Sequence, residues 1–178
     1  MAVIQHELEL TFPAAKVVRP VLCEMFRRHE VVFNVARANV TRQRGHFHFT
    51  LLGEEGVVKA AEEYLRTAGI EVHVLRSGPF EGKLPARPDR LGSNPSEPRA
   101  ARKLWLTYSE ALRDRPIVWE MACRFDVTFD IRQSSVGKDV NIMAVLLEGP
   151  ASHVEGAMEF LRRIGIEVEP IEKSVIEG

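Results

Sequence analysis

The sequence predicts an α+β protein made of two tandem copies of one small module, each an antiparallel sheet with two helices on one face. Three observations support this prediction. The two halves of the chain align with each other, both copies repeat one order of strand and helix patterns, and a proline-rich segment separates them. A length of 178 residues fits one large domain or two small ones, so the internal repeat decides between them.

A shift of 96 positions superimposes the copies without a gap over about 68 positions, and roughly a third of the aligned residues are identical. Clear matches are Leu10-Thr11-Phe12 with Leu106-Thr107-Tyr108, and Gly69-Ile70-Glu71-Val72 with Gly165-Ile166-Glu167-Val168. Chance similarity between two amphipathic stretches would not keep one register over this length. The chain is therefore predicted to be a duplication.

Each copy has the pattern strand, helix, strand, strand, helix, strand. In the first copy these are Gln5–Phe12, an apolar helical stripe over 17–26 with Pro20 early in it, Val31–Val40, His46–Leu52, Glu54–Ala68 and Ile70–Leu75. Gly69 stands where the glycine after a helix end is expected. This βαββαβ order is the ferredoxin-like pattern, which leaves the other face of the sheet open.

The segment 77–101 is predicted to be a linker between domain 1 (residues 1–76) and domain 2 (residues 102–178). It contains Pro79, Pro85, Pro88, Pro95 and Pro98 together with Gly78, Gly82 and Gly92. It shows neither a strand nor a helix period. As a flexible coil it would span roughly 28 Å root-mean-square, so the modules can reach each other.

Composition excludes several classes of protein. A net charge of −1 gives no global attraction to nucleic acid or anionic membrane. No apolar run is long enough to span a membrane and the N-terminus does not read as a signal peptide, so a cytoplasmic protein is expected. Cys23 and Cys123 are not equivalent under the repeat and are expected to be reduced, buried structural thiols. No nucleophile–base motif or phosphate loop is present, so we predict neither catalysis nor a cofactor.

The repeated motifs resemble the NIL domain, a small ACT-like regulatory module of methionine-importer ATPase subunits. The first copy carries Leu10-Thr11-Phe12, Pro20-Val21-Leu22, Val32-Phe33-Asn34-Val35-Ala36 and Gly69-Ile70-Glu71-Val72. The second carries Leu106-Thr107-Tyr108, Pro116-Ile117-Val118, Thr128-Phe129-Asp130-Ile131-Arg132 and Gly165-Ile166-Glu167-Val168. Order and spacing match twice, over everything but the linker and the ends.

The resemblance implies a methionine-like amino acid as ligand and a regulatory role. It assigns ligand contacts to Asn34, Val35, Ala36, Phe12, Pro20, Asp130 and Ile131. The family signature Asn-Ile-Leu is replaced by Asn34-Val35-Ala36 in the first copy and by Asp130-Ile131-Arg132 in the second. Because a carboxylate lacks the donor of an amide and repels a ligand carboxylate, the second copy is expected to bind something else or nothing.

Three histidines offer an alternative. His46, His48 and His73 alternate with apolar residues and are expected on the open face of the sheet, where they could hold zinc. A solvated polar face is the other interpretation, because Ile142, Ala144 and Glu169 occupy the matching positions of the second copy. Arg37, Arg42 and Arg44 form a basic stretch without the exposed aromatic residues that RNA-binding sheets use, so nucleic acid is not an expected partner.

On the second copy, the open face is predicted to be covered by protein. Trp105, Ile142, Ala144 and Leu146 would form an apolar patch there, and such patches mark association sites. The leading hypothesis is a small-molecule sensor acting as a homo-oligomer or as a pseudo-dimer within one chain. The alternatives are a module that docks on a transporter or enzyme without a ligand, and a metal-binding protein.

Overall fold

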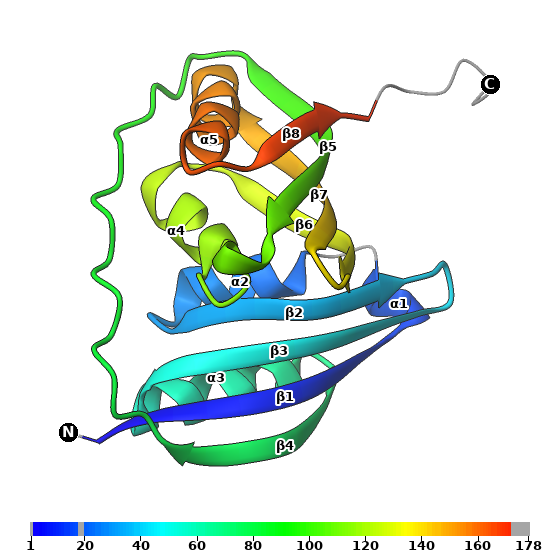
Figure 1. Ribbon diagram of the computed structural model, residues 1–178, viewed down its shortest axis with the longest axis vertical. Helices are drawn as coiled ribbons and strands as arrows, with labels where there is room; N and C mark the ends of the chain where they lie inside the picture. Colours follow the sequence, from blue (N-terminus) through cyan, green and yellow to red (C-terminus); the bar gives the residue numbers. More distant parts are fainter. Residues whose placement is uncertain (1, 18–19, 172–178) are drawn as a thin grey trace.

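The computed structural model describes residues 2–17 and 20–171, and both copies follow the expected order of strands and helices (Figure 1). The first copy contains β1 (Val3–Pro13), α1 (Ala14–Val17), α2 (Val21–Arg28), β2 (Val32–Val40), β3 (Arg44–Glu54), α3 (Glu55–Thr67) and β4 (Glu71–Pro79). The second contains β5 (Arg99–Ser109), the short 3-10 helix η1 (Glu110–Leu112), α4 (Ile117–Arg124), β6 (Thr128–Val136), β7 (Val140–Pro150), α5 (Ala151–Arg163) and β8 (Glu167–Pro170).

Local sequence explains the helix ends. Gly69 and Gly165 follow α3 and α5 with φ of 90° and 99°, as predicted for a glycine that ends a helix in the left-handed region. The helical stripe predicted over 17–26 is instead the short α1 followed by α2, and Val18 and Arg19 lie outside the described residues. Pro20 precedes the first residue of α2, where its missing N–H costs no hydrogen bond.

The strands form one eight-stranded sheet, which corrects the prediction of two separate sheets. Its order is β4-β1-β3-β2-β6-β7-β5-β8, and neighbouring strands are antiparallel throughout. The copies join where β2 pairs with β6, through Ala38 opposite Ser134 and Asn39 opposite Gln133. β2 and β6 are the inner edge strands of their own copies, and their unpaired backbone groups satisfy each other at this junction.

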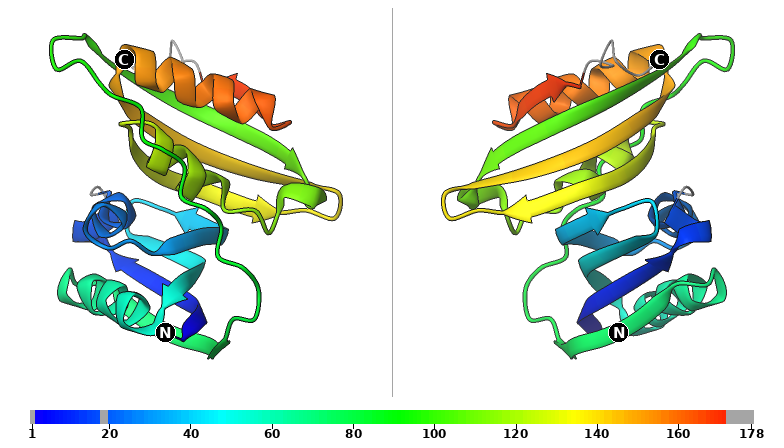
Figure 2. Two further views of the ribbon diagram at one scale, coloured as in Figure 1. Left: turned by 90° about the vertical axis from the view of Figure 1, so that its left-hand side faces the viewer. Right: turned by 90° about the vertical axis from the view of Figure 1, so that its right-hand side faces the viewer.

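Helices cross the junction and make the core continuous. α4 packs against β2, and α2 packs against β6. Phe33 of the first copy stacks on Phe129 of the second with ring centroids 5.5 Å apart, and Phe26 of α2 lies 6.5 Å from Phe129. All three rings are buried. Figure 2 shows the two copies one above the other, so the duplication folds as one body with its own internal interface.

The linker is held along one side of the molecule (Figures 1 and 2). Because β4 extends to Pro79 and β5 begins at Arg99, the segment without regular structure is 80–98, shorter than the predicted linker. The Leu91 N–H donates to the carbonyl of Arg124 in α4 at 2.8 Å. This anchoring differs from the flexible coil expected from composition.

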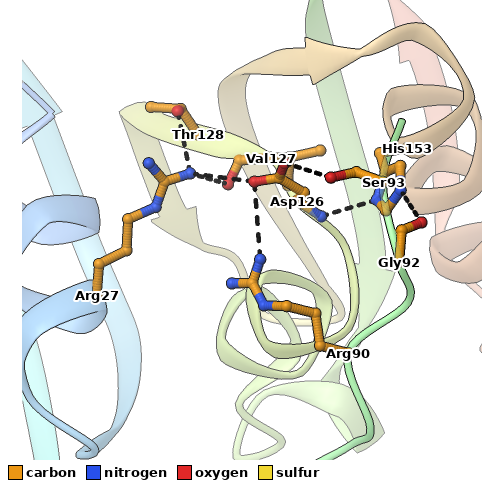
Figure 3. A network of polar contacts seen from close by, with 8 residues as sticks. All are labelled: Arg27, Arg90, Gly92, Ser93, Asp126, Val127, Thr128 and His153. Carbon is orange, nitrogen blue, oxygen red and sulfur yellow. Dashed lines mark hydrogen bonds and ion pairs between the residues drawn. The ribbon is translucent and has the colours of Figure 1, made fainter. Parts of the chain in front are cut away.

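Asp126 connects the linker with both copies, as Figure 3 shows. Its carboxylate accepts a hydrogen bond from the Ser93 hydroxyl at 3.1 Å and lies 3.7 Å from the Arg90 guanidinium, both in the linker. Arg27 of α2 lies 3.9 Å from the same carboxylate. The Asp126 N–H donates to His153 Nδ1, and His153 Nε2 donates to the Gly92 carbonyl, each at 2.9 Å. The contacts around Asp126 therefore hold together the linker, the first copy and the second copy.

None of the helices in the described part of the chain is long and apolar enough to cross a membrane.

Candidate functional site

The repeat places two related clefts at the junction, each between a helix start of one copy and the inner edge strand of the other. One joins Pro20 to Asp130, and the other joins Pro116 to Asn34. Under the shift of 96 positions these pairs correspond to each other. We name them the Pro20–Asp130 cleft and the Pro116–Asn34 cleft.

The Pro20–Asp130 cleft lies next to a small cavity that shares Pro20 and Asp130 with it. The cleft is lined by Pro20, Thr128, Asp130, Arg132, Leu146 and Glu148. The cavity has a volume of about 20 Å³, room for about one water molecule, and its walls are Phe12, Pro20, Val21, Leu22, Val40, Gly45 and Phe47 from the first copy with Phe129, Asp130 and Ile131 from the second. Most of these side chains are aliphatic or aromatic, so the cavity suits an apolar group.

Gly45 lies in the wall of this cavity, and we name it the Gly45 cavity. A Cβ at this position would lie 3.3 Å from the Cβ of Phe12, so a methyl group would crowd this wall. In the second copy the matching residue is Asn141, whose side chain is fully buried and donates to the Ser109 carbonyl at 3.4 Å. The first copy thus has a glycine where the second copy buries an amide.

In the cleft, Asp130 and Arg132 form a charged pair. The Arg132 guanidinium lies 2.7 Å from the Asp130 carboxylate. Burial raises the pKa of the Asp130 carboxyl above its ordinary value, the Arg132 charge opposes this rise, and Glu148 adds to it. A partly desolvated carboxylate and a guanidinium therefore stand together beside an apolar cavity.

In the Pro116–Asn34 cleft the signature amide already has a partner within the chain. Asn34 Nδ2 donates to the Arg113 carbonyl at 3.1 Å and so braces β2 against the segment before α4. A carboxylate only accepts hydrogen bonds, so Asp130 cannot make the equivalent contact with a carbonyl. The linker residues Phe80, Lys83 and Pro85 also line this cleft, beside Asp114.

The predicted ligand residues therefore divide between two places. Phe12, Pro20, Asp130 and Ile131 meet at the Gly45 cavity. Asn34 lies in the other cleft, and Val35 is buried opposite Phe49. Ala36 lies at a register shift of β2, and Arg132 lies at the same point of β6.

Sequence reasoning missed Gly45 and Arg132. The repeat alignment holds a signal for the first, a glycine opposite the buried amide of Asn141. The signal for the second is a basic residue within the segment aligned with the family signature.

His46 and His48 line one pocket, whereas His73 lines another. His48 Nε2 lies 2.6 Å from a Glu7 carboxylate oxygen, and His46 Nδ1 lies 3.4 Å from the Thr11 hydroxyl. His73 lies on β4, opposite Glu9 of β1. Within residues 2–17 and 20–171, no group of three or more His, Cys, Asp or Glu side chains is placed to hold a metal ion. The arrangement fits the solvated polar face better than the zinc site.

The predicted apolar patch on the second copy is only partly covered within one chain. Ala144 is buried, Trp105 and Leu146 are half-buried, and Ile142 is 37% exposed. Trp105 lies opposite Ala144 in the pairing of β5 with β7, as the shared face requires. Cover by a second protein stays a prediction.

Both cysteines are buried and free. Burial raises the pKa of the Cys23 thiol above its ordinary value and that of the Cys123 thiol to about 11. Because the thiolate is the reactive form, both positions fit structural thiols.

Comparison with known proteins identifies the family. The NIL domain model matches residues 7–74 and again residues 102–170, which together make up most of the chain. No curated protein matches the chain closely enough to count as a relative.

Among solved structures, an unknown protein from Galdieria sulphuraria is 10% identical with a TM-score of 0.32, over 96% of this chain and 99% of that one. Aminoacylhistidine dipeptidase from Vibrio alginolyticus is 9% identical with a TM-score of 0.39, over 96% of this chain and 40% of that one. A protein described as a candidate glycine cleavage system transcriptional repressor is 8% identical with a TM-score of 0.33, over 94% and 96%. Likeness at this level carries no function over. The chain belongs to the NIL domain family through its two matched segments, and it carries the domain twice.

Proposed function

We propose that this protein is a regulatory module that binds one small molecule, without transforming it, in the Pro20–Asp130 cleft. Membership of the NIL family supports a regulatory, ligand-binding role. The position of the ligand is supported by the Gly45 cavity, which lies beside the charged side chains of Asp130 and Arg132. Two buried free thiols are in keeping with a reducing compartment, and we propose the cytoplasm.

The chemistry of the cleft favours an amino acid with an apolar side chain. The side chain would extend into the Gly45 cavity as Phe12 and Phe47 move aside, and each methylene that it buries there would contribute about 0.8 kcal/mol. The ammonium group would pair with Asp130, and the carboxylate would pair with Arg132. This arrangement avoids the repulsion expected between Asp130 and the ligand carboxylate, because Asp130 contacts the ammonium group of the ligand instead. Methionine, implied by the family resemblance, is the first candidate.

Titration calorimetry with L-methionine tests the site. Asp130→Asn removes the partner of the ammonium, and a charged hydrogen bond contributes about 1.5–3 kcal/mol, so affinity should fall about 10- to 100-fold. Gly45→Ala places a methyl group in the cavity and should weaken binding of methionine more than binding of alanine. Asn34→Ala is the matched control at the equivalent position, and it should leave affinity within about twofold.

N-acetyl-methionine provides a second control, because it keeps the side chain and carboxylate but lacks the cation. It should bind far more weakly than methionine. Loss of methionine binding in Asn34→Ala with full binding in Asp130→Asn would place the site in the other cleft. If no apolar amino acid binds the wild-type protein at millimolar concentration, the proposed function is wrong.

Docking on a protein partner without a ligand is a second candidate function. The exposed side chains of Ile142 and Val140 favour it, since they lie on β7 beside the half-buried Trp105 and Leu146. If this face associates with a second copy, Ile142→Asp should convert a dimer to a monomer in light scattering after gel filtration. A monomeric wild-type protein whose Trp105 is freely quenched by acrylamide would contradict cover of this face by a second copy.

A further inference from the structure

A row of hydrogen-bonded polar side chains runs from solvent into the core at the outer edge of the first copy, and none of its residues lines either cleft. It consists of Ser77 on β4, His6 on β1 and Glu62 on α3. His6 and Glu62 are buried, with 7% and 5% exposure, whereas Ser77 is exposed. The Ser77 Oγ lies 2.8 Å from His6 Nε2, and His6 Nδ1 is hydrogen-bonded to the Glu62 carboxylate.

The order of Ser77, His6 and Glu62 determines which nitrogen of the His6 ring carries the proton. A carboxylate only accepts hydrogen bonds, so His6 Nδ1 carries the proton and donates it to Glu62. In the neutral ring Nε2 is then an acceptor, and it receives the hydroxyl proton of Ser77. Glu62 fixes this tautomer and faces the imidazole, so it can stabilise an imidazolium. A serine, a base and an orienting acid stand in the order that activates a nucleophile.

The fold does not require this chain of residues. The second copy has Arg102 in place of His6 and Met158 in place of Glu62, and Met158 is buried on α5. Buried ionisable pairs are seldom more stabilising than apolar residues of similar size. The first copy therefore keeps a buried acid and base where its duplicate uses a methionine.

The backbone beside Ser77 offers a hydrogen-bond donor to a developing oxyanion. The Phe80 N–H donates to the Val3 carbonyl at 2.9 Å, and His6 pairs with Ser77 in the same register. This bond makes Val3 and Phe80 a hydrogen-bonded pair of the ladder. Hydrogen-bonded and non-hydrogen-bonded pairs alternate in an antiparallel ladder, so His6 and Ser77, three positions further along, form a non-hydrogen-bonded pair. The Ser77 N–H then points away from β1, and β4 is the outermost strand of the sheet. This N–H is directed toward the free edge.

From this geometry we propose that Ser77 is an activated nucleophile that takes an acyl group from small activated esters. Its oxygen attacks the ester carbonyl while the hydroxyl proton passes to His6 Nε2. The carbon–oxygen bond of the ester then breaks, and the alcohol leaves with that proton. Water attacks the acyl-serine with His6 again as base, and the carboxylic acid departs as Ser77 regains its proton. An exposed serine on an edge strand is open to esters with short acyl groups.

A fluorophosphonate probe and p-nitrophenyl acetate test this proposal on the full chain. The probe phosphonylates an activated serine with loss of fluoride, and peptide mass spectrometry should find it on Ser77. Ser77→Ala should abolish labelling and the release of p-nitrophenolate, whereas Ser109→Ala, at another exposed serine, should change neither. General bases contribute about 100-fold or more, so His6→Gln should lower the labelling rate of Ser77 by that factor.

Glu62 is a positioning residue, and Glu62→Met copies the residue of the second copy. It should slow labelling of Ser77 while circular dichroism shows the wild-type fold, and Glu62→Gln serves if the methionine variant does not fold. Labelling of Ser77 no faster than that of Ser109 would overturn the proposal. Equal labelling in wild-type protein and a folded Glu62 variant would also overturn it, and would leave the three residues a structural brace. Methionine binding is measured separately, so failure here does not touch the proposed cleft.

Discussion

The two copies share one backbone plan, yet they fill equivalent positions in opposite ways. The first has Gly45 in the wall of a small cavity and buries the ionisable pair of His6 and Glu62. The second has the buried Asn141 at the position of Gly45 and uses its own buried histidine, His153, to hold the linker. The difference teaches that duplication frees one copy to supply most of the cavity walls while the other supplies the charges of Asp130 and Arg132 at the junction.

Gly149 gives the largest expected difference between the copies. A Cβ at Gly149 would lie 2.5 Å from the backbone carbonyl oxygen of Asp126, whereas a Cβ at the equivalent Gly53 would lie 3.7 Å from Val58. Backbone cannot move aside cheaply, so Gly149→Ala should cost about 3 kcal/mol. Gly53→Ala should lie within about 1 kcal/mol of wild type. Urea unfolding measures both, and equal costs would contradict the asymmetry.

His153 gives the next largest effect, because both its ring nitrogens are engaged. Its counterpart in the first copy is Val57, so His153→Val makes the copies alike at this position. The change leaves the Asp126 N–H and the Gly92 carbonyl without their partner and should cost about 1–3 kcal/mol. Limited proteolysis should also cut the segment 80–98 faster. An unchanged rate of cleavage would show that the linker is held by other contacts.

Asp130 gives the smallest effect, which appears as a dependence of stability on pH. Burial raises the pKa of this carboxyl in the folded state, so the folded state binds the proton more tightly than the unfolded state. The stability that this group contributes is therefore present at low pH and lost as pH rises above its ordinary value of 3.8 through the raised one. Asp130→Asn should lack that loss.

Unfolding free energies measured from pH 3 to pH 7 should show wild type falling relative to Asp130→Asn as pH rises. A constant difference between the two proteins would mean that Asp130 titrates alike in the folded and unfolded states. The variant also restores the amide present at Asn34, so the same series reports whether an amide in β6 braces the junction.

Much of the fold could be read from local patterns. Alternation in Leu8, Leu10 and Phe12 placed β1 and its buried face, and Gly69 marked the end of α3 because only glycine takes that backbone readily. The repeat predicted the second copy from the first, and its motifs indicated the NIL family that the two matched segments confirm. These are features that neighbouring residues determine among themselves.

The candidate site could be predicted from the sequence only in part, because it depends on contacts between segments far apart. The sequence named Phe12, Pro20, Asp130 and Ile131, and the structure brings these four together. It also named Asn34, which the junction turns toward the Arg113 carbonyl. No local pattern could show this, since the partner is a backbone group of the other copy.

The sequence by itself determined the duplication, the order of strands and helices and the faces that each buries, because these follow from periodicity and from residue conformational preferences. Only the tertiary structure decided that β2 and β6 join the copies into one sheet, and that Gly45 and Asp130 line the same small cavity. The tertiary structure also decided that Ser77 of β4, His6 of β1 and Glu62 of α3 lie within hydrogen-bonding distance of one another. Edge pairing and side-chain proximity depend on how finished elements pack, and that packing is a property of the whole chain.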